Sequence, residues 1–242
     1  MWAVREQPEQ QAPPVQRLRI RYAKRGRLRF TSHRDFSRAF ERALVRARIP
    51  MAYSSGFNPH PRISYAGAAP TGAASEAEYL EIGLAETGDP ARIAAELDEA
   101  LPDGLDVLEV VVAGAGSLAD RLEASRWLID LPDTPGSALT EAAEAFLAAD
   151  TVTVERMTKK GLRSFDSRAA VLALTVSAYD AGSRLEVLLR HTVPSVRPDD
   201  VLSGLRHCSG LEVEGTPLVT RLEQGSYDAT TGGLRDPFEA AR

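Results

Sequence analysis

The 242-residue sequence has one cysteine, Cys208, and no apolar run near the roughly 18 residues that a membrane-spanning helix needs. A single cysteine excludes an intramolecular disulfide, and it excludes any metal or iron–sulfur site built from cysteines of this chain alone. Residues 1–16 lack the apolar core of a secretory signal and are rich in Gln and Pro, which predicts a disordered leader. We therefore expect a cytoplasmic protein that has no contact with a membrane.

Motifs that bind phosphates or activate a nucleophile are also missing. The chain has no phosphate-binding glycine loop, no dinucleotide fingerprint after a strand, no Gly-x-Ser-x-Gly elbow and no Cys-x3-Cys-x2-Cys cluster motif. His207 and Cys208 are adjacent but have no second pair of ligands, so an incidental pair is the better interpretation. We expect no metal site in this chain and no cofactor bound by it.

Positive charge is concentrated in one stretch, although the whole chain is acidic. Residues 15–65 contain thirteen Lys or Arg and two Asp or Glu, whereas the chain has a net charge of −5. A basic block on an acidic chain is typical of a surface that binds a polyanion. Ten of its cations are predicted to bind RNA: Arg17, Arg19, Arg21, Lys24, Arg25, Arg27, Arg29, Arg34, Arg38 and Arg42.

The first of these cations alternate with apolar residues. In Arg17–Tyr22, the period of two predicts a half-buried strand with its arginines on the outer face. The alternation resumes at Arg27–Phe30, after a turn, so five arginines are expected on one sheet face. A solvated strand face is the alternative, but the absence of interleaved acids weighs against it.

A helix is expected from Ser32, its N-cap, to Pro50, which stops it. Asp35 lies in the first turn, where a carboxylate suits the helix dipole. The inward face is predicted to consist of Phe36, Phe40, Ala43, Leu44 and Ala47. Arginines occupy the opposite arc, so this helix presents a cationic stripe.

The segment Gly56-Phe57-Asn58-Pro59-His60-Pro61 predicts a stiff, irregular loop. It holds Asn58 and His60, which can both donate and accept hydrogen bonds, between restricted backbone positions. Such a loop is suited to recognition, and a purely structural turn is the alternative.

Ser32-His33-x-Asp35, together with His60 and Glu78, could form a metal site or an acid–base pair. His33 and Asp35 are two residues apart in one helical turn and therefore do not share a face. Helix capping with polar surface residues is the alternative. The candidate catalytic residues are His33, Asp35 and His60.

The expected element order predicts an α+β fold of two tandem ferredoxin-like domains with antiparallel sheets, each β-α-β-β-α-β. Local echoes support a repeat: Asp-Pro-x-x-Ile…Gly-Leu-x-Val at 89–107 and Arg-Pro-Asp-Asp-Val…Gly-Leu-Glu-Val at 197–213. The predicted parts are domains at 17–113 and 125–224, a linker at 114–124 and a flexible tail at 225–242. The open sheet face would carry the strand arginines.

Four motifs resemble those of a known family: Lys24-x-Gly-x-x-Arg-Phe-x-Ser-His-x-Asp35, Phe40-Glu41-Arg42-Ala43-Leu44, Ala52-Tyr53-Ser54-x-Gly56-Phe57-Asn58-Pro59-His60-Pro61 and Glu78-Tyr79-Leu80. The family is that of the radical S-adenosylmethionine (SAM)-linked proteins, which include stand-alone actinobacterial members. The resemblance is dense over 17–85 and implies a separate radical SAM partner that carries a 4Fe–4S cluster and S-adenosylmethionine. Genes of the family tend to lie near ribosomal-protein and ribonuclease genes, which implies RNA as the shared substrate. With Arg62 from the same loop, the matching positions predict a recognition loop: Ser32, Gly56, Phe57, Asn58, His60, Arg62, Glu78 and Tyr79.

The expected function is an accessory, non-catalytic subunit that binds tRNA or rRNA for a radical SAM enzyme, in RNA modification or translation-related processing. One alternative is an RNA-processing or RNA-modifying enzyme that uses His33 and His60 as acid and base. The other is a protein-docking adaptor for the radical SAM partner that makes no RNA contact.

Overall fold

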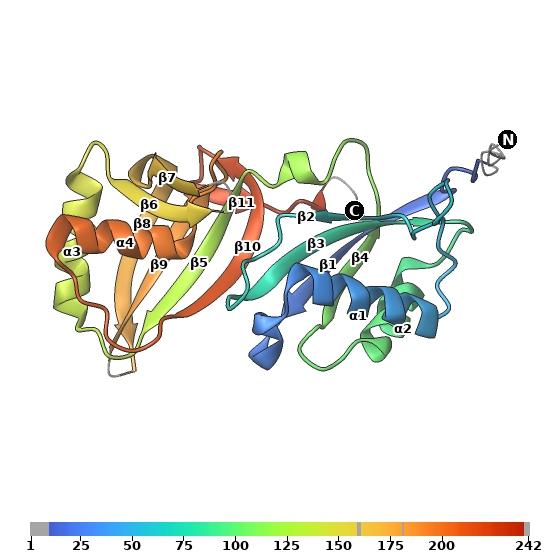
Figure 1. Ribbon diagram of the computed structural model, residues 1–242, viewed down its shortest axis with the longest axis horizontal. Helices are drawn as coiled ribbons and strands as arrows, with labels where there is room; N and C mark the ends of the chain where they lie inside the picture. The colour runs from blue at the N-terminus through green and yellow to red at the C-terminus, as the bar shows by residue number, and fades with distance from the viewer. Residues whose placement is uncertain (1–9, 159–160, 181, 240–242) are drawn as a thin grey trace, which may run out of the picture. The chain divides into compact units, whose positions relative to one another are not determined.

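The computed structural model describes residues 10–158, 161–180 and 182–239 (Figure 1). The fold is mixed α+β, with a large, mostly antiparallel sheet and a separate two-stranded one. The chain divides into two compact units, and the division after Asp120 falls within the segment predicted as a linker. The first unit contains the described residues up to Gly72, Glu76–Asp120 and those from Phe238 on, and the second contains Ala73–Ser75 and Arg121–Pro237.

The first unit has the order β-α-β-β-α-β. Its elements are β1 (Gln16–Lys24), the 3-10 helix η1 (Gly26–Phe30), α1 (His33–Arg46), β2 (Ile63–Ala66), β3 (Ala74–Leu84), α2 (Pro90–Ala100) and β4 (Val107–Val112). The strands are ordered β4-β1-β3, and β2 pairs with the outer side of β3. The β1–β4 and β2–β3 pairs are both antiparallel.

The core of the first unit lies between this sheet and both helices. Leu18 and Ile20 of β1 are fully buried and pack in one cluster with Phe40 of α1 and Leu97 of α2. Because alternate residues of a strand point to opposite faces, Arg17, Arg19 and Arg21 lie on the sheet face that the helices do not cover. The predicted inward face of α1 is confirmed for Phe36, Phe40, Ala43 and Leu44.

The expected strand at Arg27–Phe30 is wrong, because these residues lie in η1. Gly26 adopts a φ of +53°, which turns the chain away from the strand direction. The amide of Leu28 then donates to the carbonyl of Arg25 at 3.0 Å. Arg27 and Arg29 are consequently not part of the strand face.

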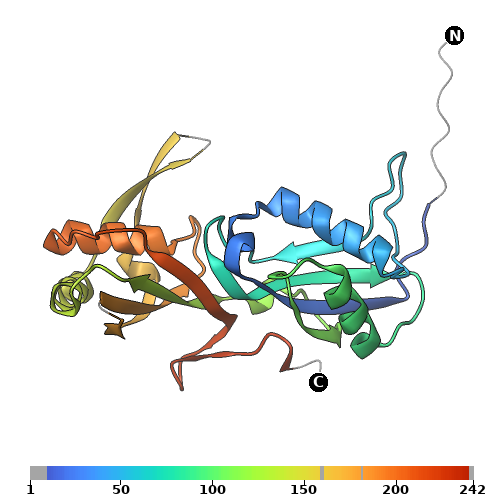
Figure 2. The same ribbon diagram turned by 90° about the horizontal axis from the view of Figure 1, so that it is seen from below.

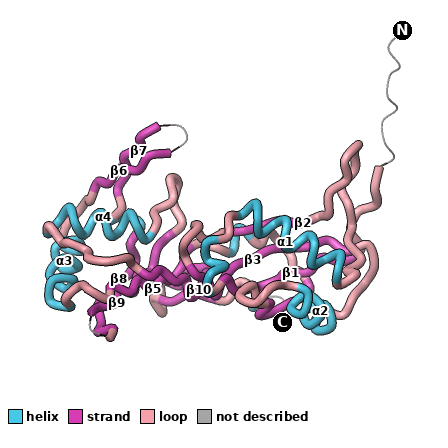
Figure 3. The backbone as a smooth tube through the Cα atoms, turned by 60° about the horizontal axis from the view of Figure 1, so that its bottom comes forward, coloured by secondary structure: helices cyan, strands magenta, loops and turns pink. Residues whose placement is uncertain are grey.

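The second unit has the same order with one hairpin inserted. Its elements are β5 (Ala124–Leu131), α3 (Gly136–Ala148), β6 (Thr153–Thr158), β7 (Gly161–Asp166), η3 (Arg168–Ala170), β8 (Val171–Tyr179), β9 (Gly182–Arg190), α4 (Pro198–Ser209), β10 (Leu218–Asp228) and β11 (Gly233–Arg235). The strand order is β10-β5-β9-β8, with antiparallel neighbours, and β11 pairs with β10. The β6–β7 hairpin forms its own sheet and extends away from β8 and β9 (Figure 3). The short helix η2 (Ala119–Arg121) lies at the division between the units.

The ends of the chain differ in part from the sequence-based expectation. The segment 225–239 is folded rather than a flexible tail, because β10 continues to Asp228, β11 pairs with it, and Phe238 is fully buried. The predicted leader is described only from residue 10, and its residue Val15 donates its amide to the carbonyl of Leu84 at 2.9 Å. None of the helices in the described part of the chain is long and apolar enough to cross a membrane.

Candidate functional site

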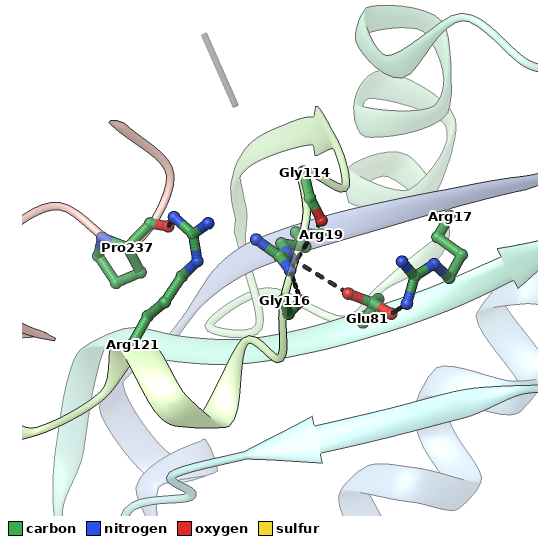
Figure 4. Close-up of polar contacts among 7 residues, drawn as sticks. All are labelled: Arg17, Arg19, Glu81, Gly114, Gly116, Arg121 and Pro237. Carbon is green, nitrogen blue, oxygen red and sulfur yellow. Dashed lines mark hydrogen bonds and ion pairs between the residues drawn. The ribbon is translucent and has the colours of Figure 1, made fainter. Parts of the chain in front are cut away.

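The arginines of β1 face away from the helices, but acids of the same unit neutralise them. Arg19 is fully buried, and its Nε donates to Glu81 of β3 at 3.1 Å. Its Nη2 donates to the carbonyls of Gly114 and Gly116, at 3.2 and 2.6 Å (Figure 4). Arg17 donates to the other oxygen of Glu81 at 3.1 Å. Glu81 therefore joins two of the predicted RNA-binding arginines into an internal ion-pair network.

The next cations are engaged in the same way. Arg21 lies 3.6 Å from Glu109 of β4, and Arg25 binds both Glu76 and Asp106. The hydrogen bond with Glu76 raises the pKa of Arg25 above its ordinary value. Desolvation opposes this rise, and the charge of Asp106 adds to it. The guanidiniums of Arg21 and Arg25 are therefore already paired with carboxylates of the same unit.

Lys24 and Glu78 both hold the loop before β3. The side chain of Lys24 is buried, with its Nζ 3.4 Å from the carbonyls of Ala69 and Pro70. Glu78 is buried and accepts from the amide of Ala69. Tyr79, also buried, packs edge-on against the ring of Phe238. Neither Glu78 nor Tyr79 belongs to an exposed recognition loop.

A second group of cations, on α1, is exposed. Arg34, Arg38 and Arg42, which we call the α1 ridge, follow one another every four residues on the outer side of the helix. None of the three has an ion pair or a hydrogen bond from its side chain among the residues that the structure describes. Neighbouring members are separated by about 6 Å along the helix axis. The ridge is therefore a row of free positive charges.

The segment before α1 adds another cation and an aromatic ring. The guanidinium of Arg29 lies 4.7 Å from the ring centroid of Phe30, and this ring is 59% exposed. Arg27 is exposed as well. An exposed ring near exposed Arg27 and half-buried Arg29 is a platform on which a base can stack.

The loop predicted from its Gly, Asn and Pro content is present and is closed at its base. The amide of Ser54 donates to the carbonyl of His60 at 2.8 Å, and the amide of His60 donates to the hydroxyl of Ser54 at 3.0 Å. Arg62 donates from Nε to the carbonyl of Tyr53 at 3.0 Å. Gly56 has a φ of +121°, a conformation that favours glycine. The hydrogen bonds between Ser54 and His60 thus close the base of the loop, and Gly56 allows its sharp turn.

The tip of this loop offers unengaged side chains. Phe57 is 61% exposed, and Asn58 and His60 are exposed as well. The side chains of Asn58 and His60 form no hydrogen bond within the described residues. Residues 51–61 project past the C-terminal end of α1 (Figure 2).

A pocket of about 130 Å³ connects the base of this loop with α1. It is lined by Glu41, Leu44, Val45, Ile49, Met51, Tyr53 and Pro61. A shallow groove on the same helix is lined by Arg38, Glu41, Arg42 and Val45, so Glu41 and Val45 belong to both. The C-terminal half of the α1 ridge therefore lies next to the base of the loop.

The candidate catalytic residues are not brought together. The hydroxyl of Ser32 accepts from the amide of Asp35 at 3.2 Å and donates to its carboxylate at 2.6 Å, as in helix capping. His33 packs edge-on against Tyr65, with ring centroids 4.7 Å apart. His33 is the first residue of α1. Glu41, the first residue of this helix that lines the pocket at the loop base, lies about 12 Å further along the helix axis. His60 lies on that loop, so the two histidines do not form one acid–base pair.

Two of the side chains at this site, Glu41 and Tyr53, were not predicted from the sequence. The signal for Glu41 is that it is the one acid between Arg38 and Arg42. Tyr53 gives no such signal, because its exposure depends on how residues 51–61 fold back on β3. Among the residues that the structure describes, no group of three or more His, Cys, Asp or Glu could hold a metal ion.

One family model matches more than half of the chain. The model of the family described as "Uncharacterized protein conserved in bacteria (DUF2344)" matches residues 17–198. A search of the curated proteins gave no match.

Similarity to the solved structures is distant. A chain of "Crystal Structure of a Cbf5-Nop10-Gar1 Complex" is 11% identical with a TM-score of 0.47, covering 93% of this chain and 58% of that one. This chain thus spans 58% of the length of that relative. The "First Two RRM Domains of Yeast Poly(U) Binding Protein (Pub1)" are 10% identical with a TM-score of 0.21, covering 85% and 98%. At these TM-scores and identities, the similarity carries no information about the function of this chain.

Proposed function

The chain belongs to this conserved bacterial family, DUF2344, and we propose that it binds RNA through the α1 ridge and the loop at residues 54–61. In this proposal it is the accessory subunit of a separate radical SAM enzyme that modifies or processes tRNA or rRNA. The α1 ridge is the observation that carries the RNA part of the proposal. It presents three exposed guanidiniums to which no acid of the described part of the chain is bound, while the β1 arginines are paired.

We assign phosphate binding to the α1 ridge because it costs less free energy there than at the arginines that are paired with carboxylates. A phosphate that binds Arg19 or Arg25 must displace a carboxylate already bonded to it, whereas Arg34, Arg38 and Arg42 exchange only water and counterions. Guanidiniums bind phosphate oxygens through paired N–H donors. Exposed Phe30 and Phe57 supply aromatic faces for unpaired bases. Phosphate binding and base stacking together favour single-stranded or loop RNA.

The fold also supports RNA binding, but on a different face of the first unit from the one predicted. Both units have the β-α-β-β-α-β order, and we assign them as tandem ferredoxin-like units, the second with the β6–β7 insertion. Many RNA-binding sheets of this topology use the open sheet face. In the first unit that face carries the paired arginines of β1, so we assign RNA binding to the helix side instead.

The radical SAM partner is proposed from the resemblance of the four motifs at 24–35, 40–44, 52–61 and 78–80. The partner would supply the 4Fe–4S cluster and S-adenosylmethionine, since this chain has one cysteine. Co-expression of the two proteins and affinity purification tests this association. Copurification in equal amounts supports it, and complete separation in low salt contradicts it.

RNA binding is tested with a variant that removes two charges of the ridge, Arg38→Gln/Arg42→Gln. Fluorescence anisotropy with a labelled single-stranded RNA measures affinity between 50 and 200 mM salt. Three phosphate contacts predict about 18-fold weaker binding over this range, and one remaining contact predicts only about threefold. The matched control is Arg92→Gln/Arg206→Gln, which removes two exposed helical arginines elsewhere. The control should keep the wild-type slope, and an unchanged slope in the ridge variant would contradict the proposal.

A further inference from the structure

Glu41 is an acid in the middle of a cationic surface. It lies between Arg38 and Arg42 in the sequence and lines both the groove that they form and the pocket at the loop base. Its side chain is exposed and has no hydrogen bond or ion pair among the described residues. A free carboxylate here weakens the attraction for phosphates. A role in selecting the ligand would explain why an acid lies at this position.

The pocket also has apolar side chains and a volume suited to a planar ring. Its lining includes Leu44, Ile49 and Met51, and Tyr53 stands at its edge with 41% of its surface exposed. Its volume, about 130 Å³, is close to that of an apolar cavity of about 150 Å³ that binds benzene. A planar ring can therefore enter it, while a ribose and a phosphate remain outside, next to Arg38 and Arg42.

We infer that this pocket takes an unpaired guanine base of the bound RNA, an inference that rests on the proposed function. A carboxylate only accepts hydrogen bonds, through two oxygens. Guanine presents two adjacent donors, N1–H and the N2 amino group, which match these oxygens. Cytosine, adenine and uracil each place an acceptor beside the donor on that edge, and this acceptor would face a negative oxygen. Glu41 selects the base, the apolar lining holds its ring, and Arg38 and Arg42 bind the flanking phosphates.

The test uses four labelled RNA probes of eleven nucleotides: all uridine, and the same with one central guanosine, inosine or adenosine. Inosine lacks only the N2 amino group and so removes one of the two donors. The wild-type protein should bind the guanosine probe at least about fivefold more tightly than the adenosine probe, with inosine between them. Glu41→Gln should lose this preference and bind the all-uridine probe more tightly than the wild-type protein does, because a negative charge beside Arg38 and Arg42 is removed. The matched control Glu99→Gln, exposed on α2 and with no ion pair among the described residues, should keep the preference.

The possible results separate this inference from the function on which it rests. Equal affinity of the wild-type protein for all four probes, with the expected salt slope, would overturn the guanine pocket and leave RNA binding intact. Retention of the guanosine preference in Glu41→Gln would overturn the role of Glu41. If no probe binds in a salt-dependent manner, both the pocket and the proposed function are wrong. In that case the pocket and groove are better explained as a docking surface for a protein.

Discussion

Removing Glu81 should destabilise the first unit strongly, because Glu81 is the one carboxylate paired with Arg19 among the residues that the structure describes. Arg19 is fully buried, so it cannot regain water when its counterion is lost. Removal of one partner from a buried ion pair costs about 3–5 kcal/mol. We expect Glu81→Leu to lower the free energy of unfolding by this amount.

The reverse substitution should cost less. In Arg19→Met, Glu81 keeps its ion pair with Arg17 and about 15% of its side-chain surface in water. The lost hydrogen bonds to Gly114 and Gly116 account for about 1–3 kcal/mol. The double variant Arg19→Met/Glu81→Leu leaves no buried charge. Its unfolding free energy should be closer to that of Arg19→Met than to the sum of both losses.

Hydrogen exchange read by mass spectrometry measures these differences locally, on peptides from β1 and β3. Arg17→Met is the control, because its guanidinium is half exposed and its ion pair is worth under about 1 kcal/mol. If the two losses are additive, or if Glu81→Leu costs no more than Arg17→Met, then Arg19 is not a desolvated framework residue. In that case the β1 arginines return as candidates for ligand binding.

Two further predictions concern the thiol and the loop. Burial raises the pKa of the Cys208 thiol, so less thiolate is present at pH 8 than for a free cysteine. Alkylation of Cys208 by iodoacetamide should therefore be slower in the native protein than in urea. Equal alkylation rates in the two conditions would contradict this prediction. Gly56→Ala places a side chain at a φ of +121° and should cost about 1–3 kcal/mol locally. Limited proteolysis should then cut residues 54–61 faster. The control Gly136→Ala, which also has free space for a methyl group and no positive φ, should leave the digestion unchanged.

Much of the local structure could be predicted from the sequence. The N-cap at Ser32, the inward face of α1 at Phe36 and Phe40, and the stiff loop around Gly56 all depend on neighbours in the chain. The alternation at Arg17–Tyr22 also gave the correct strand and the correct face for each residue. The strand at Arg27–Phe30 was wrong because a short alternation does not distinguish a strand from a 3-10 turn once a glycine redirects the chain.

The sequence by itself determined where the positive charge is, since residues 15–65 hold thirteen of the cations and two acids. Which of these charges remain free was decided only by the tertiary structure. Strand pairing brings Glu81 to Arg19 across 62 residues of sequence and Asp106 to Arg25 across 81. Such contacts depend on the register of the sheet, which local patterns do not encode. The arginines of the α1 ridge stay available because they are exposed and pair with no acid within the described residues.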